Sequence, residues 1–256
     1  MYKIEPKDYT KYLRYIDESG CGRVYPCSIA EAVQSGELFI NAVSDSRSVL
    51  YWHYSGFAFC YGICDACFLE AVYDFMTDKS NTARRRFVLF SDRDFITRFF
   101  RTKAGVVVEK RHFFEYHNDA PVIEAALPPG YGLCEITKEL LLKINGRITP
   151  AFSWDHDDSF LEKGKGYCIT NGSHVAAWAF SAAVSSEEID IGVETDSRYR
   201  NLGFAYIVAQ RMIQFCLKQH KMPVWACHAG NTASNKLAEK LGFLKVAECD
   251  TIKAGD

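Results

Sequence analysis

The sequence has 256 residues, of which 30 are basic and 32 acidic, so its formal net charge is -2. Hydrophobic residues make up 48% and charged residues 24%, proportions that are typical of a globular protein and exclude a disordered or collagen-like chain. This length suits one large domain or two ordinary ones, and we expect two. The near-neutral charge gives no reason to expect a nucleic-acid partner.

The first half of the chain predicts alternating helices and strands, which indicates an α/β layer structure. The most apolar stretch, Val49 to Leu69, is interrupted by polar residues and glycines, so it suits a buried hairpin better than a membrane span. The expected helices are Tyr9 to Ile16, Ser28 to Val33, Ala66 to Phe75 and Asp92 to Phe100, and the expected strands are Phe39 to Val43, Val49 to Tyr54, Phe87 to Phe90 and Val106 to Glu109.

Turn-forming residues separate the two halves. They are concentrated near Asp119-Ala120-Pro121 and at Pro128-Pro129-Gly130. We therefore expect an N-terminal α/β domain over residues 1–125 and a second domain over residues 126–256.

The second domain has a clearer order of elements. The expected strands are Gly132 to Ile136, Gly166 to Thr170, Val175 to Ala183, Glu188 to Thr195, Pro223 to Cys227 and Leu244 to Glu248. The expected helices are Lys138 to Ile144, Gly203 to Gln219 and Thr232 to Leu241, with a polar loop around Trp154 to Asp158.

The turn before the long helix has the chemistry of a phosphate site. It reads Arg200-Asn201-Leu202-Gly203-Phe204-Ala205. A helix N-terminus carries unpaired backbone N–H groups and a partial positive charge, so it attracts phosphate. Glycine at 203 allows a close approach of backbone to ligand, and Arg200 adds a cation. An ordinary strand-to-helix connection would explain this string equally well if it stood alone.

The residues that follow make the pattern more specific. Asn231 and Ser234 open the next helix, and Leu241-Gly242-Phe243 leads from it into the last strand. With the R-x-x-G-x-A turn, this order resembles the GNAT superfamily of N-acetyltransferases from about Tyr131 to the end. The N-terminal extension, with Phe152-Ser153-Trp154 and Phe160-Leu161, more faintly resembles the subgroup that includes the zwittermicin-resistance acetyltransferase.

The resemblance implies a GNAT-type mixed, partly splayed β-sheet flanked by helices, preceded by a second α/β domain that lies on the acceptor side or has a structural role. It also implies acetyl-CoA as co-substrate, with the pantetheine arm along Val193 to Thr195. The diphosphate would lie on the amides of the turn, and Asn231 and Ser234 would face the same cofactor. The implied cofactor-binding residues are Val193, Thr195, Arg200, Asn201, Leu202, Gly203, Phe204, Ala205, Asn231 and Ser234.

Acetyl transfer to an amine needs a base, because an alkyl ammonium has a pKa of about 10. Alternation along the strand puts Glu188, Asp190 and Glu194 on one face, which suggests a cleft that binds and deprotonates cations. We favour Glu194 because it is nearest the turn, and a solvated strand face is the alternative. A backbone N–H near Val193 would stabilise the oxyanion.

One position departs from the family. Many GNAT enzymes have a tyrosine seven residues after the asparagine, and this sequence has Ala238 there. A thiolate can leave without a dedicated acid, since a thiol has a pKa of about 8.5. A non-catalytic acyl-CoA-binding regulator therefore stays open as an alternative to an enzyme. The chain also ends soon after Glu248, so we expect the last strand to be short or absent.

The acceptor side is expected in the loop that holds Trp154, Asp155 and Asp157. An aromatic ring beside carboxylates suits a primary amine of a small molecule. The neighbouring His156 and Asp158 make a metal site imaginable, but adjacent residues point in different directions, and an acidic cluster at a helix N-terminus is favoured. We therefore expect no metal.

Three cysteines give a further alternative. Cys60, Cys64 and Cys67 have the C-x-x-x-C-x-x-C spacing of some iron-sulfur proteins, but their apolar surroundings favour buried thiols.

The amino terminus does not have the pattern of a secretory signal, so we expect a cytoplasmic protein with no membrane partner. The sequence leaves a homodimer open.

Overall fold

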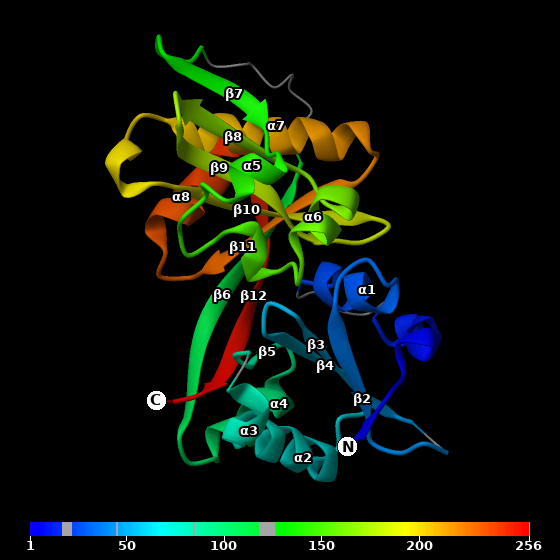
Figure 1. Ribbon diagram of the computed structural model, residues 1–256. Coiled ribbons are helices and arrows are strands. Elements are labelled where there is room, and N and C mark those ends of the chain that lie inside the picture. Colours follow the sequence, from blue (N-terminus) through cyan, green and yellow to red (C-terminus); the bar gives the residue numbers. More distant parts are fainter. Residues whose placement is uncertain (17–21, 45, 84, 118–125, 256) are drawn as a thin grey trace. The chain divides into compact units, whose positions relative to one another are not determined.

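The computed structural model describes residues 1–16, 22–44, 46–83, 85–117 and 126–255 (Figure 1). The chain forms two compact units. The first unit contains Met1–Phe113, Cys227–Asn231 and Val246–Asp256, and the second contains Phe114–Ala226 and Thr232–Lys245. The predicted boundary at residue 125 lies outside the described residues and stays a prediction.

The strands of the first unit follow the order β1-β2-β3-β4-β5-β12-β6. Helices α2 and α4 pack on this sheet through Phe68, Val72 and Phe100. The elements are β1 (Tyr2–Lys3), η1 (Pro6–Tyr15), α1 (Val24–Ala30), β2 (Gly36–Ile40), β3 (Ser48–His53), β4 (Phe57–Gly62), α2 (Ala66–Thr77), α3 (Lys79–Thr82), β5 (Val88–Ser91), α4 (Asp94–Arg101) and β6 (Val106–Tyr116).

The second unit is a mixed α/β structure whose strands β11-β10-β9-β8-β7 are consecutive neighbours. Its core includes Trp178, Phe180 and Phe204, each at most 1% exposed. The elements are β7 (Tyr131–Glu135), α5 (Lys138–Leu141), η2 (Pro150–Phe152), α6 (Asp157–Lys163), β8 (Gly166–Asn171), β9 (His174–Val184), β10 (Glu188–Thr195), η3 (Ser197–Tyr199), α7 (Phe204–Lys218), β11 (Met222–His228), α8 (Thr232–Leu241) and β12 (Phe243–Ala254).

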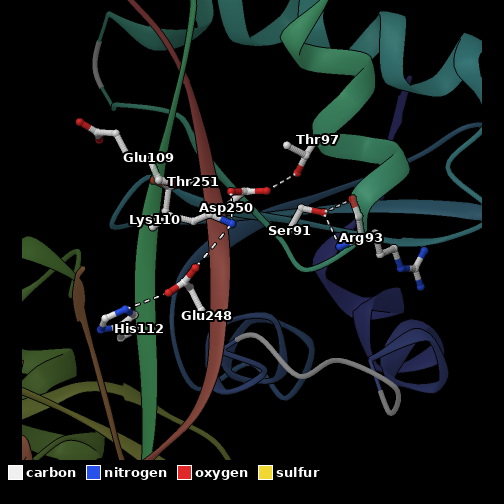
Figure 2. A network of polar contacts seen from close by, with 9 residues as sticks. All are labelled: Ser91, Arg93, Thr97, Glu109, Lys110, His112, Glu248, Asp250 and Thr251. Atoms are coloured by element: carbon white, nitrogen blue, oxygen red, sulfur yellow. Dashed lines mark hydrogen bonds and ion pairs between the residues drawn. The ribbon is translucent and has the colours of Figure 1, made fainter. Parts of the chain in front are cut away.

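The prediction that the last strand is short or absent was wrong. β12 runs to Ala254, and Ile252 is fully buried in the core of the first unit. Figure 2 shows how β12 is fixed there: Thr97 on α4 donates to Asp250 at 2.7 Å, and the Lys110 ammonium lies 2.8 Å from the same carboxylate. The C-terminus therefore completes the sheet of the first unit.

Two predicted boundaries in the first unit were wrong for identifiable reasons. Helix α1 starts at Val24 and not at Ser28, since Pro26 lies in the first turn, where a backbone N–H has no internal partner. Strand β2 ends at Ile40, because the Asn41 side chain accepts hydrogen bonds from the backbone of Arg47 and Ser48 and forms the turn. The apolar stretch after Val49 forms the predicted hairpin as β3 and β4.

Within the described ranges, no helix is both long and apolar enough to cross a membrane.

Candidate functional site: an open strand edge, a left-handed turn and a helix N-terminus

Strands β10 and β11 pair in parallel over a short distance and then part. The pairs are Glu188 with Met222, Ile189 with Pro223 and Asp190 with Val224. β10 stays paired with β9 on its other side as far as Thr195. Residues 191–195, which we call the open edge, therefore offer backbone groups to an extended ligand as a sheet edge does.

The open edge ends at a side chain without a partner. The hydroxyl oxygen of Thr195 is buried, and none of the described residues forms a hydrogen bond with it. A buried hydroxyl normally has a partner, because leaving one unpaired costs about 1–3 kcal/mol. A polar ligand arm lying on the open edge would supply that partner.

The turn after the open edge, residues 196–205, is stiffened by an ion pair. The Asp196 carboxylate accepts from the Arg198 backbone N–H at 2.9 Å and from its guanidinium Nε and Nη2 at 3.0 Å each. These bonds lower the pKa of Asp196 to about 2, so the carboxylate is ionised at any ordinary pH. We call residues 196–205 the carrier turn.

The carrier turn presents consecutive backbone N–H groups. Asn201 and Gly203 have left-handed φ values of 64° and 79°, and α7 follows directly. No side chain caps this helix. In the part of the chain that the structure describes, the N–H groups from Arg200 to Ala205 have no recorded acceptor. Such a run of N–H groups at the head of a 15-residue helix binds anions, phosphate above all.

Packing holds the turn in place. The Phe204 side chain is 1% exposed, and its ring centroid lies 4.8 Å from that of Tyr131 on β7. Tyr131 also contacts Tyr199 edge-on at 6.2 Å. The sequence pattern did not reveal Tyr131, because a single aromatic residue at the start of a strand has no signature of its own.

A cross-strand pair holds the loop between α5 and η2. Glu194 and Trp178 lie opposite each other on β10 and β9. The Ile148 backbone N–H donates to Glu194 Oε2 at 2.6 Å, and the Trp178 indole N–H donates to the Ile148 carbonyl at 2.7 Å. Gly146 approaches the same two side chains so closely that a Cβ would lie 2.4 Å from Glu194 and 2.7 Å from Trp178. We call this contact the loop clasp.

The three predicted carboxylates lie on one face of β10 but do not converge. The register shifts by one residue of β9 between the pairs Asp190–Ala183 and Ile191–Ser181, a β-bulge on β9 that keeps the alternation of β10 itself intact. At about 3.3 Å per residue, Glu188 and Glu194 are about 20 Å apart along the strand. Asp190 is 5% exposed and is the last residue before β10 and β11 part.

The residues of the predicted acceptor loop differ in how far they are exposed. Trp154 is 3% exposed, and its indole N–H donates to the Ser181 carbonyl at 2.8 Å, so its ring belongs to the core. Asp155 is half-buried. Asp157 and Asp158 are exposed in the first turn of α6, which is the acidic cluster at a helix N-terminus that the sequence favoured. Trp154 is therefore a core residue, and its contact with a substrate, like those of Asp155 and Asp157, stays a prediction.

Helix α8 begins directly after Asn231, whose backbone N–H donates to the His228 carbonyl at 2.8 Å. The Ser234 hydroxyl accepts from the Trp225 indole at 3.1 Å. Ala238, where the sequence departs from the family pattern, is fully buried and lies in the core.

The three cysteines with iron-sulfur spacing differ in exposure. Cys60 and Cys64 are buried and Cys67 is exposed. Among the residues with described coordinates, no group of three or more His, Cys, Asp or Glu side chains is arranged to hold a metal ion.

Comparison with known proteins places the chain in a family. The family model for GNAT acetyltransferase matches residues 24–252. The chain belongs to the GNAT acetyltransferase family. It is therefore an acyltransferase, and its mixed α/β fold is the GNAT fold.

Similar proteins agree with this. The uncharacterized N-acetyltransferase YdfB of Bacillus subtilis (strain 168) is 25% identical over 97% of this chain and 96% of its own length. A crystal structure of a GCN5-related N-acetyltransferase-like protein from Streptococcus suis 89/1591 has a TM-score of 0.77 at 19% identity and covers 98% of this chain and 100% of that one. A tandem GNAT protein from the clavulanic acid biosynthesis pathway has a TM-score of 0.64 at 10% identity, with 99% and 97% covered.

Proposed function

We propose that this acetyltransferase moves an acetyl group from acetyl-CoA to a primary amine of a small molecule. The observation that carries the proposal is the carrier turn, where unpaired N–H groups, two left-handed residues and a helix N-terminus follow an open strand edge. The diphosphate of CoA fits the amides of Arg200 to Ala205. Its extended pantetheine arm fits the open edge, where Val193 and Thr195 lie, and the buried Thr195 hydroxyl gains a partner.

The direction of the arm decides which carboxylate is the base. The thioester is at the opposite end of the pantetheine arm from the diphosphate. With the diphosphate on the carrier turn, the arm runs back along β10 and brings the thioester near Asp190, where the strands part. Glu194 is near the diphosphate end, and one of its oxygens is bound by the loop clasp. We therefore propose Asp190 as the base and Glu194 as a residue that positions the acceptor loop.

The reaction that we propose is a direct transfer. Asp190 takes a proton from the substrate ammonium, and the neutral amine attacks the thioester carbonyl. A backbone N–H of the open edge near Val193 stabilises the oxyanion. The carbon–sulfur bond then breaks, the CoA thiolate leaves, and the nitrogen loses its second proton, which reaches the thiolate through water. A thiol has a pKa of about 8.5, so the thiolate can leave without a dedicated acid at Ala238.

A non-catalytic acyl-CoA-binding regulator is the second candidate, and the fully buried Ala238 is the observation that favours it. The two candidates differ in turnover. Thiol release from acetyl-CoA would be measured across a panel of small primary amines. Release with at least one amine supports the enzyme, whereas binding without release on any amine supports the regulator.

The assignment of the carrier turn needs its own test. Calorimetry with acetyl-CoA would compare wild type with Gly203→Glu, which places a carboxylate at the head of α7. We expect a loss of affinity of about 100-fold or more. Gly172→Glu is the matched control, because Gly172 also has a left-handed φ, of 57°, and open space around it. Equal affinity in wild type and Gly203→Glu would remove the assignment.

Several finer predictions are also part of this proposal. We propose that the chain is similar to the subgroup that includes the zwittermicin-resistance acetyltransferase, on the basis of its N-terminal extension. The cytoplasmic location, the open possibility of a homodimer and the expectation of no nucleic-acid or membrane partner remain predictions from the sequence.

A further inference from the structure

The two units repeat one order of strands and main helices. Each runs through a strand, two or three helical segments, three strands, a main helix, a strand, a helix and a last strand. The central segment is β4-α2-β5 in the first unit, with the short α3 after α2, and β10-α7-β11 in the second, with the short η3 before α7. Both β4 with β5 and β10 with β11 pair in parallel. The first unit thus has the same strand–helix–strand framework that holds the open edge and the carrier turn in the second.

From this repeat we infer that the first unit is a second copy of the acetyl-CoA-binding framework, closed from within by Arg93 and Asp65. The chain then binds one acetyl-CoA, in the second unit. This inference rests on the proposed function, since it takes the carrier turn as the acetyl-CoA site.

The strand edge in the first unit opens as it does in the second. β4 pairs with β5 from Phe57 to Phe59 and then parts from it. Residues 60–62 of β4 therefore correspond to the open edge of β10. The residue before the strands part is Phe59, where β10 has Asp190. The first unit thus has no carboxylate at the position that we propose for the base.

A side chain of the first unit occupies this second edge. The Gly62 carbonyl accepts from the Arg93 guanidinium. Arg93 lies between β5 and α4, and its backbone N–H donates to the Ser91 hydroxyl at 3.1 Å, as Figure 2 shows. A pantetheine arm would have to displace the Arg93 guanidinium.

The turn that follows is also closed. Residues 63–65 connect β4 to α2, whereas residues 196–203 connect β10 to α7. Asp65 caps α2, and its carboxylate accepts from the Phe68 backbone N–H at 2.8 Å. That carboxylate takes up a helix N–H and places a negative charge where the second unit would place a diphosphate. Like charges repel, so a second diphosphate is excluded.

Calorimetric titration of the full chain with acetyl-CoA tests the inference, with Gly172→Glu as the folded control. We expect one acetyl-CoA per chain in wild type and in Gly172→Glu, and no measurable binding in Gly203→Glu. Leu202→Glu replaces Gly203→Glu in the test if Gly203→Glu does not fold. Leu202 is 50% exposed, and this substitution adds the same charge to the turn without changing a glycine. Circular dichroism checks that each variant is folded.

The outcomes separate the inference from the proposed function. Two molecules per chain would overturn the inference alone, since the first unit would then also hold acetyl-CoA. One molecule that both Gly203→Glu and Leu202→Glu still bind with wild-type affinity would remove the assignment of the carrier turn, and the inference with it. No binding to wild type would overturn the proposed function and the inference with it. One molecule, lost in either variant, supports both.

Discussion

The segment from β10 into α7 and the segment from β4 into α2 begin alike and end differently. In both segments the two parallel strands are paired over three residues and then part. α7 is headed by Gly203 with a left-handed φ and no side-chain cap, whereas α2 is headed by Asp65, which caps it. The N–H groups at the start of α7 are therefore available to a ligand, whereas the Asp65 carboxylate takes up one of those at the start of α2.

The largest expected effect concerns the residue before the strands part. Asp190→Asn removes the proposed base, so kcat/KM at neutral pH should fall by about 10²- to 10⁴-fold. The affinity for acetyl-CoA should not change, because the substitution leaves the carrier turn intact. Thiol-release kinetics and calorimetry measure the two quantities. A variant with the wild-type rate would show that Asp190 is no more catalytic than Phe59, its counterpart in the first unit.

The next-largest effect distinguishes the role of Glu194 from that of Asp190. Strand β4 of the first unit has no carboxylate that corresponds to either residue. Glu194→Gln keeps an oxygen that can accept from Ile148, so it should retain most activity. Glu194→Ala and Trp178→Phe each leave one Ile148 backbone group unpaired, at a cost of about 1–3 kcal/mol. We expect these two variants to raise KM for the amine about tenfold or more, since about 1.4 kcal/mol corresponds to a tenfold change.

The control for the loop clasp is the affinity for acetyl-CoA, which should be the same in all three variants. If Glu194→Gln instead loses as much kcat as Glu194→Ala, Glu194 is the base and the assignment of Asp190 fails.

The sequence predicted the second unit better than the first, and particular residues explain why. The R-x-x-G-x-A string marked the carrier turn, because Gly203 and the helical apolar spacing after it are local signals. The repeat in the first unit has no such signal: its turn, residues 63–65, is shorter, and Asp65 stands at the position where the string would end. The shared order of elements is visible only in the strand pairings.

Other features depend on partners that are distant in the sequence. The loop clasp joins Glu194 and Trp178 to backbone atoms of Ile148. The position of a backbone hydrogen-bond partner cannot be predicted from the identity of its side chain. β12 continues to Ala254 because Ile252 is buried against residues near the start of the chain. A local pattern cannot contain either contact.

Acid should affect the two units differently. Burial lowers the pKa of His53, in the first unit, from 6.5 to about 3. Between these values the unfolded chain binds a proton that the folded chain does not, so this contribution to stability is complete above pH 6.5 and is lost as the pH falls. The loss is about 1.4 kcal/mol per pH unit. In the second unit, Asp196 has a pKa of about 2, so the carrier turn keeps its ion pair over this range.

Thermal unfolding of wild type and His53→Asn between pH 4 and pH 7 measures this difference. Asparagine does not titrate, and its side-chain oxygen can accept from the Ser55 backbone N–H as His53 Nδ1 does. We expect the variant to lose less stability on acidification than wild type. Parallel pH curves for the two proteins would contradict the assignment to His53.

The smallest effect tests the cap that distinguishes α2 from α7. Asp65→Ala should lower the free energy of unfolding by about 1 kcal/mol, which is typical for the loss of an N-cap side chain. Asp78→Ala is the matched control, because Asp78 caps α3 in the same way, through the Ser80 backbone N–H. α2 buries Phe68, Leu69, Val72 and Met76 whereas α3 buries no residue, so Asp65→Ala should cost more. Chemical denaturation measures both. Calorimetry of Asp65→Ala should still give one acetyl-CoA per chain, because Arg93 continues to occupy the strand edge; a second bound molecule would mean that the Asp65 carboxylate alone closes the first unit.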